Sequence, residues 1–251
     1  MNVQRGGPGL GGIQPSQSDY FQATRGAGHG DFRMIVLAPA SVQEMAELTV
    51  SAFDLADKYR MTAMLLADGT MGQMMEPVAL DDLKINPMPE KPWATTGTKM
   101  ERKRNIINSL SLVPEELEQF NFARYEKYAE IERTEARAEE YRMEDAEISV
   151  AAFGIASRVS RNAVDAAREM GIKAGLIRPI TLWPFPKKAF DELGDQVKAI
   201  LDVERNILGQ MKDDVILATG NKIPVEFYGE YWDNTNEIKI VEIVKDMLGR
   251  Y

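Results

Sequence analysis

Residues 33–69 read RMIVLAPASVQEMAELTVSAFDLADKYRMTAMLLADG, and this stretch decides the fold class. Two short apolar runs, 34–38 and 63–67, have the length of buried strands. Between them a helix is predicted over 41–59, because a serine at its start and Glu44 form a capping box. Its apolar residues recur at spacings of three and four, typical of a helix that packs one face on a sheet. Strand, helix and strand in this order predict a crossover between two parallel strands.

The same order of elements returns in the second half of the chain. Residues 148–153 predict a strand, 156–170 a helix with Gly171 as its C-cap, and 173–177 another strand. The remaining predicted elements are a helix near 186–193, a strand over 197–203, a loop over 204–210, a strand over 214–218 and an amphipathic helix near 236–248. We therefore predict an α/β chain with two sheets.

Two segments lack this alternation. Residues 4–31 are rich in Gly, Gln and Ser and predict one long loop, a kind of segment that often binds ligands. Prolines break the chain after residue 77, and the charged stretch 114–145 predicts a solvated helix to which we assign no chemistry. We expect three parts, over 1–85, 86–145 and 146–251.

Composition excludes several classes of protein. The 251 residues are 44% hydrophobic and 27% charged, enough for one large or two ordinary domains. The formal net charge of -9 has the wrong sign for nucleic-acid binding. The absence of Cys rules out disulfides, a thiolate nucleophile and an iron–sulfur cluster held by this chain. No apolar run approaches the roughly 18 residues of a membrane span, and Met1 is not followed by a signal peptide, so we expect a cytoplasmic protein.

The glycine-rich loop contains a dinucleotide-binding pattern that we reject. Gly7, Gly9 and Gly12 match the spacing of that fingerprint. The fingerprint needs a strand before it and a helix directly after it, and neither is predicted here. The glycines more plausibly allow a close approach of the backbone to another group.

Three charged or titratable side chains in this region are candidates for binding. Arg5 and Arg25 flank the loop, and a guanidinium is a natural clamp for carboxylate or phosphate, although both could be ordinary surface arginines. His29, the single histidine, could shuttle protons or donate to an oxyanion, although a lone loop histidine is more often inert. No metal site is predicted, because zinc needs several His or Cys ligands.

Two later loops are open to two interpretations. Residues 181–186 read TLWPFP, a stiff apolar loop that favours interface packing over a cofactor cage. Residues 204–210 read ERNILGQ and follow a predicted strand at the edge where open α/β sheets bind ligands. Their polar groups could equally cap local backbone.

Residues 3–22, VQRGGPGLGGIQPSQSDYFQ, with Gly28-His29-Gly30-Asp31 after them, closely resemble the alpha-type subunit of 2-oxoacid:ferredoxin oxidoreductases. The resemblance extends to Pro77 and continues over 149–210, where RPITLWPFP and ERNILGQ are similar to the family's transketolase-C-terminal-like domain. Gly9-Leu10-Gly11, in place of Ser-Thr-Gly, resembles the branched-chain type, which acts on 2-ketoisovalerate. The alternatives are an alpha-type subunit for 2-oxoglutarate or pyruvate, or a non-catalytic interaction subunit that docks through 204–210.

The resemblance implies an enzyme that decarboxylates a 2-oxo acid on thiamine diphosphate, passes electrons through iron–sulfur clusters to ferredoxin and transfers the acyl group to coenzyme A. It implies that 1–85 is the C-terminal part of a pyrimidine-binding domain, 86–145 a connector with a charged helix, and 146–251 the transketolase-C-terminal-like domain. A beta subunit would hold the diphosphate and Mg, and a ferredoxin-like subunit the clusters. The residues that it assigns to binding are Gly6 and Gly7 for the cofactor, Arg5 and Arg25 for the 2-oxo acid carboxylate, and, in second rank, Gln14, Ser16 and His29.

One departure from the family limits these expectations. Family members carry a further segment before the point that corresponds to Met1, including the first strands of the pyrimidine-binding domain and the glutamate that activates the cofactor. We therefore expect the activating glutamate upstream of Met1, an exposed edge in the first sheet and no activity from this polypeptide alone. Asp68-Gly69 is similar to the start of a diphosphate–Mg motif, but no matching Asn completes it.

Overall fold

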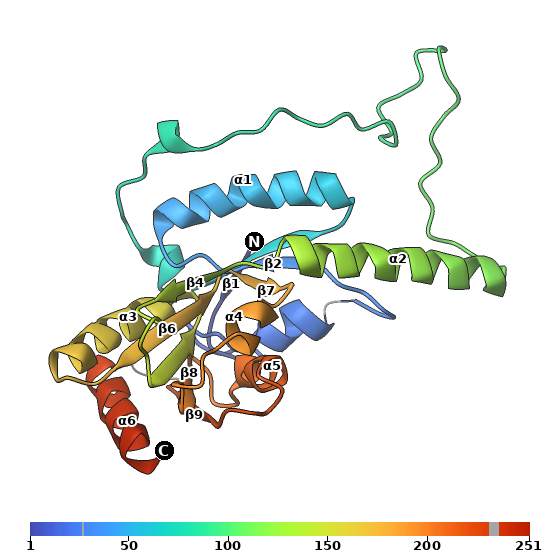
Figure 1. Ribbon diagram of the computed structural model, residues 1–251. Helices are drawn as coiled ribbons and strands as arrows, with labels where there is room; N and C mark the ends of the chain where they lie inside the picture. Colours follow the sequence, from blue (N-terminus) through green and yellow to red (C-terminus); the bar gives the residue numbers. More distant parts are fainter. Residues whose placement is uncertain (27, 231–235) are drawn as a thin grey trace.

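The computed structural model describes residues 1–26, 28–230 and 236–251. Their strands form a four-stranded sheet in the order β1-β3-β2-β7 and a five-stranded sheet in the order β4-β6-β5-β8-β9 (Figure 1). The predicted α/β class with two sheets is confirmed. No helix in the described part of the chain is long and apolar enough to cross a membrane.

The first crossover unit forms as predicted. Strand β2 (Ile35–Leu37), helix α1 (Val42–Tyr59) and strand β3 (Ala63–Asp68) follow one another, and β2 and β3 pair in parallel. The Ser41 hydroxyl accepts from the Glu44 amide at 3.0 Å. The Glu44 carboxylate accepts from the Ala40 amide at 2.6 Å rather than from the cap residue itself, so the capping box closes one residue early.

The predicted loop over 4–31 is only partly a loop. Residues Asn2–Gln4 form strand β1, which pairs in parallel with β3 and is an edge of its sheet. A short π-helix covers Gln22–Gly26. Because this segment begins in a strand and contains a helical turn near its end, fewer of its backbone groups are free than in the predicted structureless loop.

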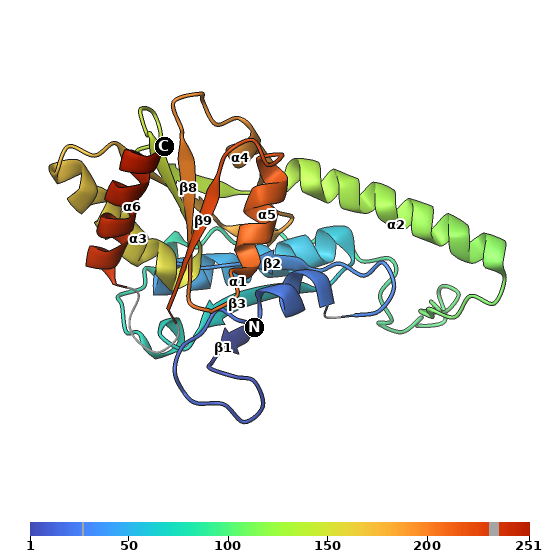
Figure 2. The ribbon, with the colours of Figure 1, turned by 90° about the horizontal axis from the view of Figure 1, so that it is seen from below.

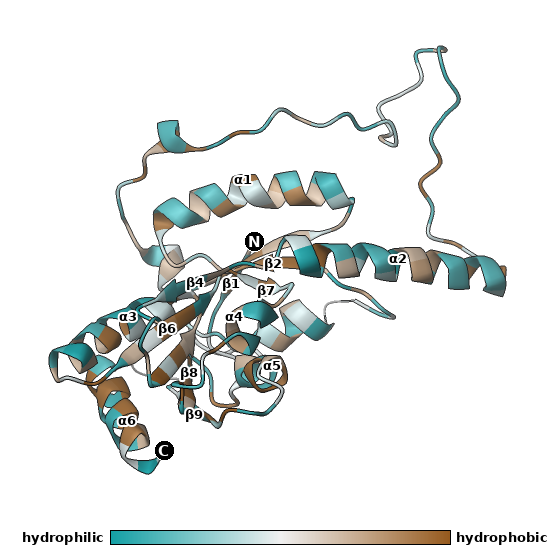
Figure 3. Cartoon of the chain, viewed as in Figure 1, coloured by the Kyte–Doolittle hydropathy of each residue, from teal (hydrophilic) through white to brown (hydrophobic). Residues whose placement is uncertain are grey.

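The second sheet has helices on both faces. Its parallel strands are β5 (Ile148–Ala152), β6 (Ala174–Pro179), β8 (Ala199–Glu204) and β9 (Val225–Gly229). Helices α3 (Gly154–Glu169) and α6 (Glu237–Arg250) pack together on one face, with α4 (Lys187–Asp191) and α5 (Gln210–Ala218) on the other (Figure 2). The strands of this sheet are mostly hydrophobic, as expected where helices cover both faces (Figure 3).

Two predicted elements are wrong. Helix α2 is Pro114–Thr134, and part of the stretch predicted to continue it to residue 145 forms strand β4 (Ala138–Tyr141), an antiparallel edge strand on β6. The predicted strand over 214–218 belongs to helix α5. A short apolar run such as this fits either element by pattern alone, and the strand of this region is β9, which the sequence did not reveal.

Strand β7 (Thr181–Trp183) joins the two halves of the chain. It leaves the second half and pairs antiparallel with β2 in the first sheet. One apolar core therefore contains Ile35, Phe153 and Trp183 from both halves. By contrast, the connector before α2 runs away from this core, and α2 itself is mostly hydrophilic (Figures 1 and 3).

Candidate functional site

The strand ends of the two sheets meet at one place, which we call the seam. Strand β3 ends at Asp68, and the first residues beyond β5 and β8 are Phe153 and Arg205. Gln17 and Asn206 complete the seam, which thus consists of Asp68, Phe153, Arg205, Gln17 and Asn206. The hydrogen bonds described below join these five residues or their immediate neighbours. Open α/β sheets bind ligands outside the carboxyl ends of their strands, so the seam is the first place to examine.

Gln17 ties the N-terminal loop to the second sheet. Its side-chain amide donates to the Phe153 carbonyl at 2.8 Å, and its Oε1 accepts from the Arg205 amide at 2.9 Å. Its backbone N–H donates to the Arg205 carbonyl at 2.8 Å, and Asn206 Nδ2 donates to its carbonyl at 3.2 Å. Gly154 has a φ of +55°, and a Cβ there would lie 3.0 Å from Gln17 Nε2, so glycine suits both the turn and the contact.

Asp68 closes the seam from the first sheet. Its carboxylate accepts from the amides of Thr70 at 2.8 Å and Met71 at 3.1 Å, and it also interacts with the amide of Ile155 in the first turn of α3. Burial raises the pKa of this carboxyl, while those amides and Arg205 act in the opposite direction. The Asp68 carboxylate therefore accepts from backbone amides of this chain.

Two buried carboxyl groups lie behind the seam on β8. Asp202 and Glu204 are two residues apart, so their side chains share one face of the strand, and both are fully buried. Glu204 accepts from the Met211 amide at 2.9 Å and from Asn206 at 2.7 Å. Burial, together with the charge of Glu204, raises the pKa of Asp202 well above its usual value. Asp202 therefore favours its protonated form, because two adjacent buried carboxyl groups resist ionising together.

The glycine-rich loop brings four of the predicted site residues together. The Arg5 guanidinium donates to the carbonyls of Gly6 at 3.3 Å and Gly12 at 3.4 Å, and to that of Leu10. The Gly6 amide donates to the carbonyl of Gln14 at 2.6 Å. Gly7 follows in the same loop and is exposed, as is Gln14. In this conformation the Arg5 guanidinium and the Gly6 amide donate to carbonyls of the loop itself and stabilise its shape.

The other predicted residues lie in separate clusters. Ser16 is fully buried at the seam, and its hydroxyl donates to the Arg205 carbonyl at 3.5 Å. Arg25 pairs with Asp214 at 2.7 Å and lies 4.4 Å from the centre of the Phe21 ring. His29 lines a different cavity, on the side of α2. The binding roles assigned to these residues stay predictions.

Helix α5 holds the cluster around Arg25. The Tyr20 hydroxyl donates to Asp214 at 2.6 Å, while Gln210 accepts from the Phe21 amide at 2.7 Å. Burial and the Asp214 carboxylate raise the pKa of Tyr20 well above its usual value, so the phenol stays protonated. The loop over 204–210 is thus used within the chain, both to start α5 and to hold the N-terminal segment.

Sequence reasoning did not identify Gln17, Asn206 or Asp202. Gln17 and Asn206 are separated by 189 residues along the chain, so no local pattern indicates their contact. The acids of β8 did give a signal, since Asp202 and Glu204 alternate within an otherwise apolar run. Buried carboxyl groups at a strand end favour a special role over an ordinary surface position.

A charged cavity of about 590 Å³ separates α1 from the second sheet. Arg178, which is buried, donates to both oxygens of Glu44 at 2.8 and 2.9 Å and to Glu139 at 2.8 Å. These bonds span the two halves, because Glu44 lies on α1 and Arg178 on β6. The Glu44 carboxylate also accepts from the Ala40 amide before α1, so one side chain links the start of α1 to β6.

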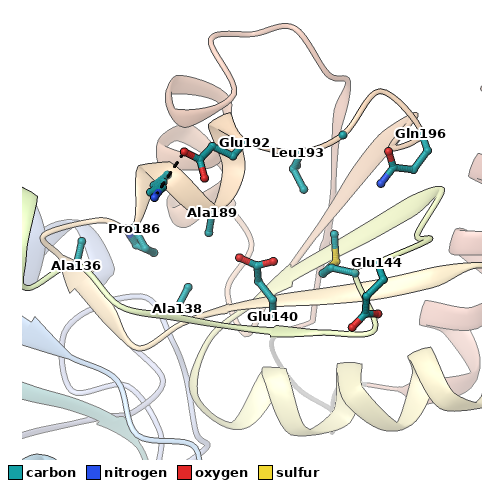
Figure 4. A pocket seen from close by; sticks show the side chains of 12 residues that line it. Ala136, Ala138, Glu140, Glu144, Pro186, Ala189, Glu192, Leu193 and Gln196 are labelled. Carbon is teal, nitrogen blue, oxygen red and sulfur yellow. Dashed lines mark ion pairs between the residues drawn. The ribbon is translucent and has the colours of Figure 1, made fainter.

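A further cavity of about 570 Å³ lies between β4 and the region of α4 (Figure 4). Glu140, Glu144 and Glu192 line it, together with small apolar side chains. None of the predicted binding residues lines this cavity or the one beside Arg178. In the described residues no group of three or more His, Asp or Glu side chains is placed to hold a metal ion.

Comparison with protein families identifies the chain. Residues 1–150 match the family described as pyruvate flavodoxin/ferredoxin oxidoreductase, thiamine diphosphate-binding, and residues 146–243 match pyruvate:ferredoxin oxidoreductase core domain II. The chain belongs to the pyruvate:ferredoxin oxidoreductase family. Within this family it is a subunit of the 2-oxoacid:ferredoxin oxidoreductase type.

Individual relatives differ clearly in similarity. Ketoisovalerate oxidoreductase subunit VorB of Methanothermobacter marburgensis is 46% identical over 250 residues, which cover 99% of this chain and 70% of the relative. The 2-oxoglutarate synthase subunit KorA of Methanothermobacter thermautotrophicus is 33% identical over 90% of this chain and 66% of its own length. The similarity to VorB is thus the stronger of the two over nearly the whole chain.

Solved structures agree on the fold. A 2-oxoglutarate:ferredoxin oxidoreductase from Magnetococcus marinus, solved with 2-oxoglutarate, coenzyme A and succinyl-CoA, superposes with a TM-score of 0.77 at 25% identity. This match covers 98% of the present chain but 48% of that chain. A split-gene transketolase in an inactive tetrameric form superposes with a TM-score of 0.50 at 14% identity, a similarity of fold alone.

The described residues do not complete a site for the thiamine diphosphate that the family implies. A diphosphate is held through a divalent cation, and no cluster of acidic ligands is present in this part of the chain. Asp68, the acid at the end of β3, accepts from backbone amides, and the Gly6 amide donates to Gln14. Any cofactor bound here needs further groups from outside these residues.

Proposed function

We propose that the chain is the alpha-type subunit of an enzyme that oxidises branched-chain 2-oxo acids, 2-ketoisovalerate first among them, to acyl-CoA with ferredoxin as electron acceptor. The observation that carries this proposal is the difference in identity. Two VorB subunits are 46% and 45% identical over 99% of the chain, whereas two KorA subunits reach 33% and 32% over 90%. The sequence Gly9-Leu10-Gly11 in the glycine-rich loop supports the same assignment.

The proposal divides the chemistry among several chains. Thiamine diphosphate is shared with a beta subunit that supplies the diphosphate and Mg site, because the described residues of this chain provide no such cluster of ligands. Iron–sulfur clusters lie on a ferredoxin-like subunit, since this chain has no Cys to hold them. Coenzyme A is the acyl acceptor, and the complex works in the cytoplasm. The contribution of this chain is to hold the N-terminal loop rigidly against the second sheet through Gln17.

Reconstitution tests the substrate assignment. The chain is assembled with its beta and ferredoxin-like partners, and coenzyme-A-dependent reduction of a viologen dye is measured with 2-ketoisovalerate, 2-oxoglutarate and pyruvate. We expect the highest kcat/KM for 2-ketoisovalerate and no activity from the chain alone. A preference for 2-oxoglutarate or pyruvate would overturn the branched-chain assignment. Equal inactivity with all three acids would favour a non-catalytic subunit, for which the exposed Ile207 and Leu208 offer a docking point.

A further inference from the structure

The cavity that contains His29 is unusually rich in positive charge. It measures about 280 Å³ and lies between the loop after the π-helix, the end of α1 and helix α2. Arg33, Arg60, Arg124 and Lys127 line it, and no carboxylate from the described residues does. This grouping is unexpected in a chain with a formal net charge of -9, because cations in an acidic protein usually have acidic neighbours.

None of these four cations has an ion-pair partner within the described ranges. Arg60 lies 4.5 Å from the centre of the Trp93 ring. Lys127 donates to the Tyr59 carbonyl at the end of α1, at 3.1 Å, which uses one of its three donors. Within the part of the chain that the structure describes, no ion pair therefore neutralises the charge of this group.

The cations also repel one another. Burial, together with the charges of Arg124 and Arg60, lowers the pKa of Lys127. A multiply charged anion at this place would remove that repulsion and accept several charge-assisted hydrogen bonds. An adjoining cavity of about 490 Å³ shares Arg60 and Lys127, and Glu130 is its one acidic lining residue. The two cavities leave room for a group larger than a single phosphate.

We propose that this cavity is a binding site for a phosphate-bearing anion, with a diphosphate or a phosphomonoester as the recognised group. Three guanidinium groups and one ammonium suit phosphate oxygens better than a single carboxylate, because a phosphate offers more acceptors and more charge. Tyr128 and Phe32 add aromatic walls beside the cations. The site is separate from the seam, and its existence does not depend on which 2-oxo acid the enzyme uses.

Calorimetric titration of the whole chain with inorganic pyrophosphate tests the site. We expect saturable binding at one site, weakened about tenfold in Arg124→Gln and in Lys127→Gln, the cost of one charge-assisted hydrogen bond. Lys188→Gln is the matched control, because this exposed lysine pairs with Glu192 and does not line this cavity, and the substitution should leave the affinity within about twofold. Circular dichroism checks the fold of each variant. Arg124 is exposed, so its substitution keeps the test valid if Lys127→Gln fails to fold.

Two results would overturn the proposal. One is the absence of saturable pyrophosphate binding at millimolar concentration and low ionic strength. The other is an equal affinity in wild type and Arg124→Gln. Competition then separates the sources of the phosphate: displacement of pyrophosphate by coenzyme A and ADP but not by pantetheine supports a site for nucleotide phosphates, and displacement by coenzyme A alone supports a site for its 3′-phosphate. Substrate preference is measured separately, so failure here leaves the proposed function standing.

Discussion

Replacing Gln17 by alanine is expected to lower the free energy of unfolding by about 3 to 5 kcal/mol. The substitution leaves the Phe153 carbonyl and the Arg205 amide without the partners that now lie at 2.8 and 2.9 Å. Each unsatisfied buried group costs about 1 to 3 kcal/mol, and the lost side chain leaves a small cavity. Because a chain of this size loses about 2 to 4 °C of Tm for each kcal/mol, Tm should fall by about 6 °C or more.

Urea unfolding followed by tryptophan fluorescence and by circular dichroism measures this loss. Gln14→Ala is the matched control, since Gln14 lies in the same N-terminal segment but is exposed. Its effect should stay within about 0.5 kcal/mol. If Gln17→Ala cost no more than Gln14→Ala, the seam would not hold the N-terminal loop on the second sheet, and the reasoning from its hydrogen bonds would be refuted.

Three further changes test other parts of the structure. Asp202→Asn removes a group whose pKa is raised by folding. Wild-type stability from this group is full below its unfolded pKa and falls, by up to about 1.4 kcal/mol per pH unit, as pH rises toward the folded pKa. In urea titrations, the free energy of unfolding of the variant should therefore rise relative to that of wild type between pH 5 and pH 8. A difference between the two proteins that stays constant with pH would contradict this. Arg178→Lys should cost about 2 kcal/mol in the same assay, because lysine cannot bind both oxygens of Glu44, and a loss under about 0.5 kcal/mol would show that the pair is unimportant. Arg25→Lys should raise KM for the 2-oxo acid about tenfold in the assembled enzyme if Arg25 clamps the substrate carboxylate, and an unchanged KM would leave it as a structural partner of Asp213 and Asp214.

Periodicity predicted the elements whose signals are local. The strand-helix-strand unit over 33–69 carries its own cap at Ser41 and its own apolar stripe, and it forms with bounds close to those expected. The apolar residues over 214–218 fit a strand and a helix equally, so their pattern predicts a strand where the structure has part of α5. The helix there is set by groups just before the run: Gly209 turns the chain with a φ of +68°, and Glu204 accepts from the Met211 amide. Neither interaction leaves a periodic signal.

The candidate site was predictable in composition but not in arrangement. Arg5, Arg25 and His29 stand out by residue type in a glycine-rich segment, yet the structure places them in three different clusters. The sequence of the charged helix α2 predicts no binding or catalytic role. Two of its cations, Arg124 and Lys127, face a cavity that forms where the end of α1 and the loop over 29–33 meet α2. Long-range packing therefore decided which charged residues form a group.

The ion pair of Arg25 sets a condition on its predicted role. Arg25 and Tyr20 both bind Asp214, so Arg25 can bind a substrate carboxylate either through its remaining donors or by exchanging Asp214 for the substrate. In the exchange, Arg25 leaves the Asp214 carboxylate. Tyr20 then remains the chief partner of that carboxylate, and its donor at 2.6 Å limits the cost of losing the arginine. Because Asp214 lies on α5, this exchange would couple substrate binding to the helix that the seam loop begins. Tyr20→Phe removes this remaining donor to Asp214. The substitution should therefore raise KM in the assembled enzyme, whereas KM would stay unchanged if Tyr20 had only a structural role.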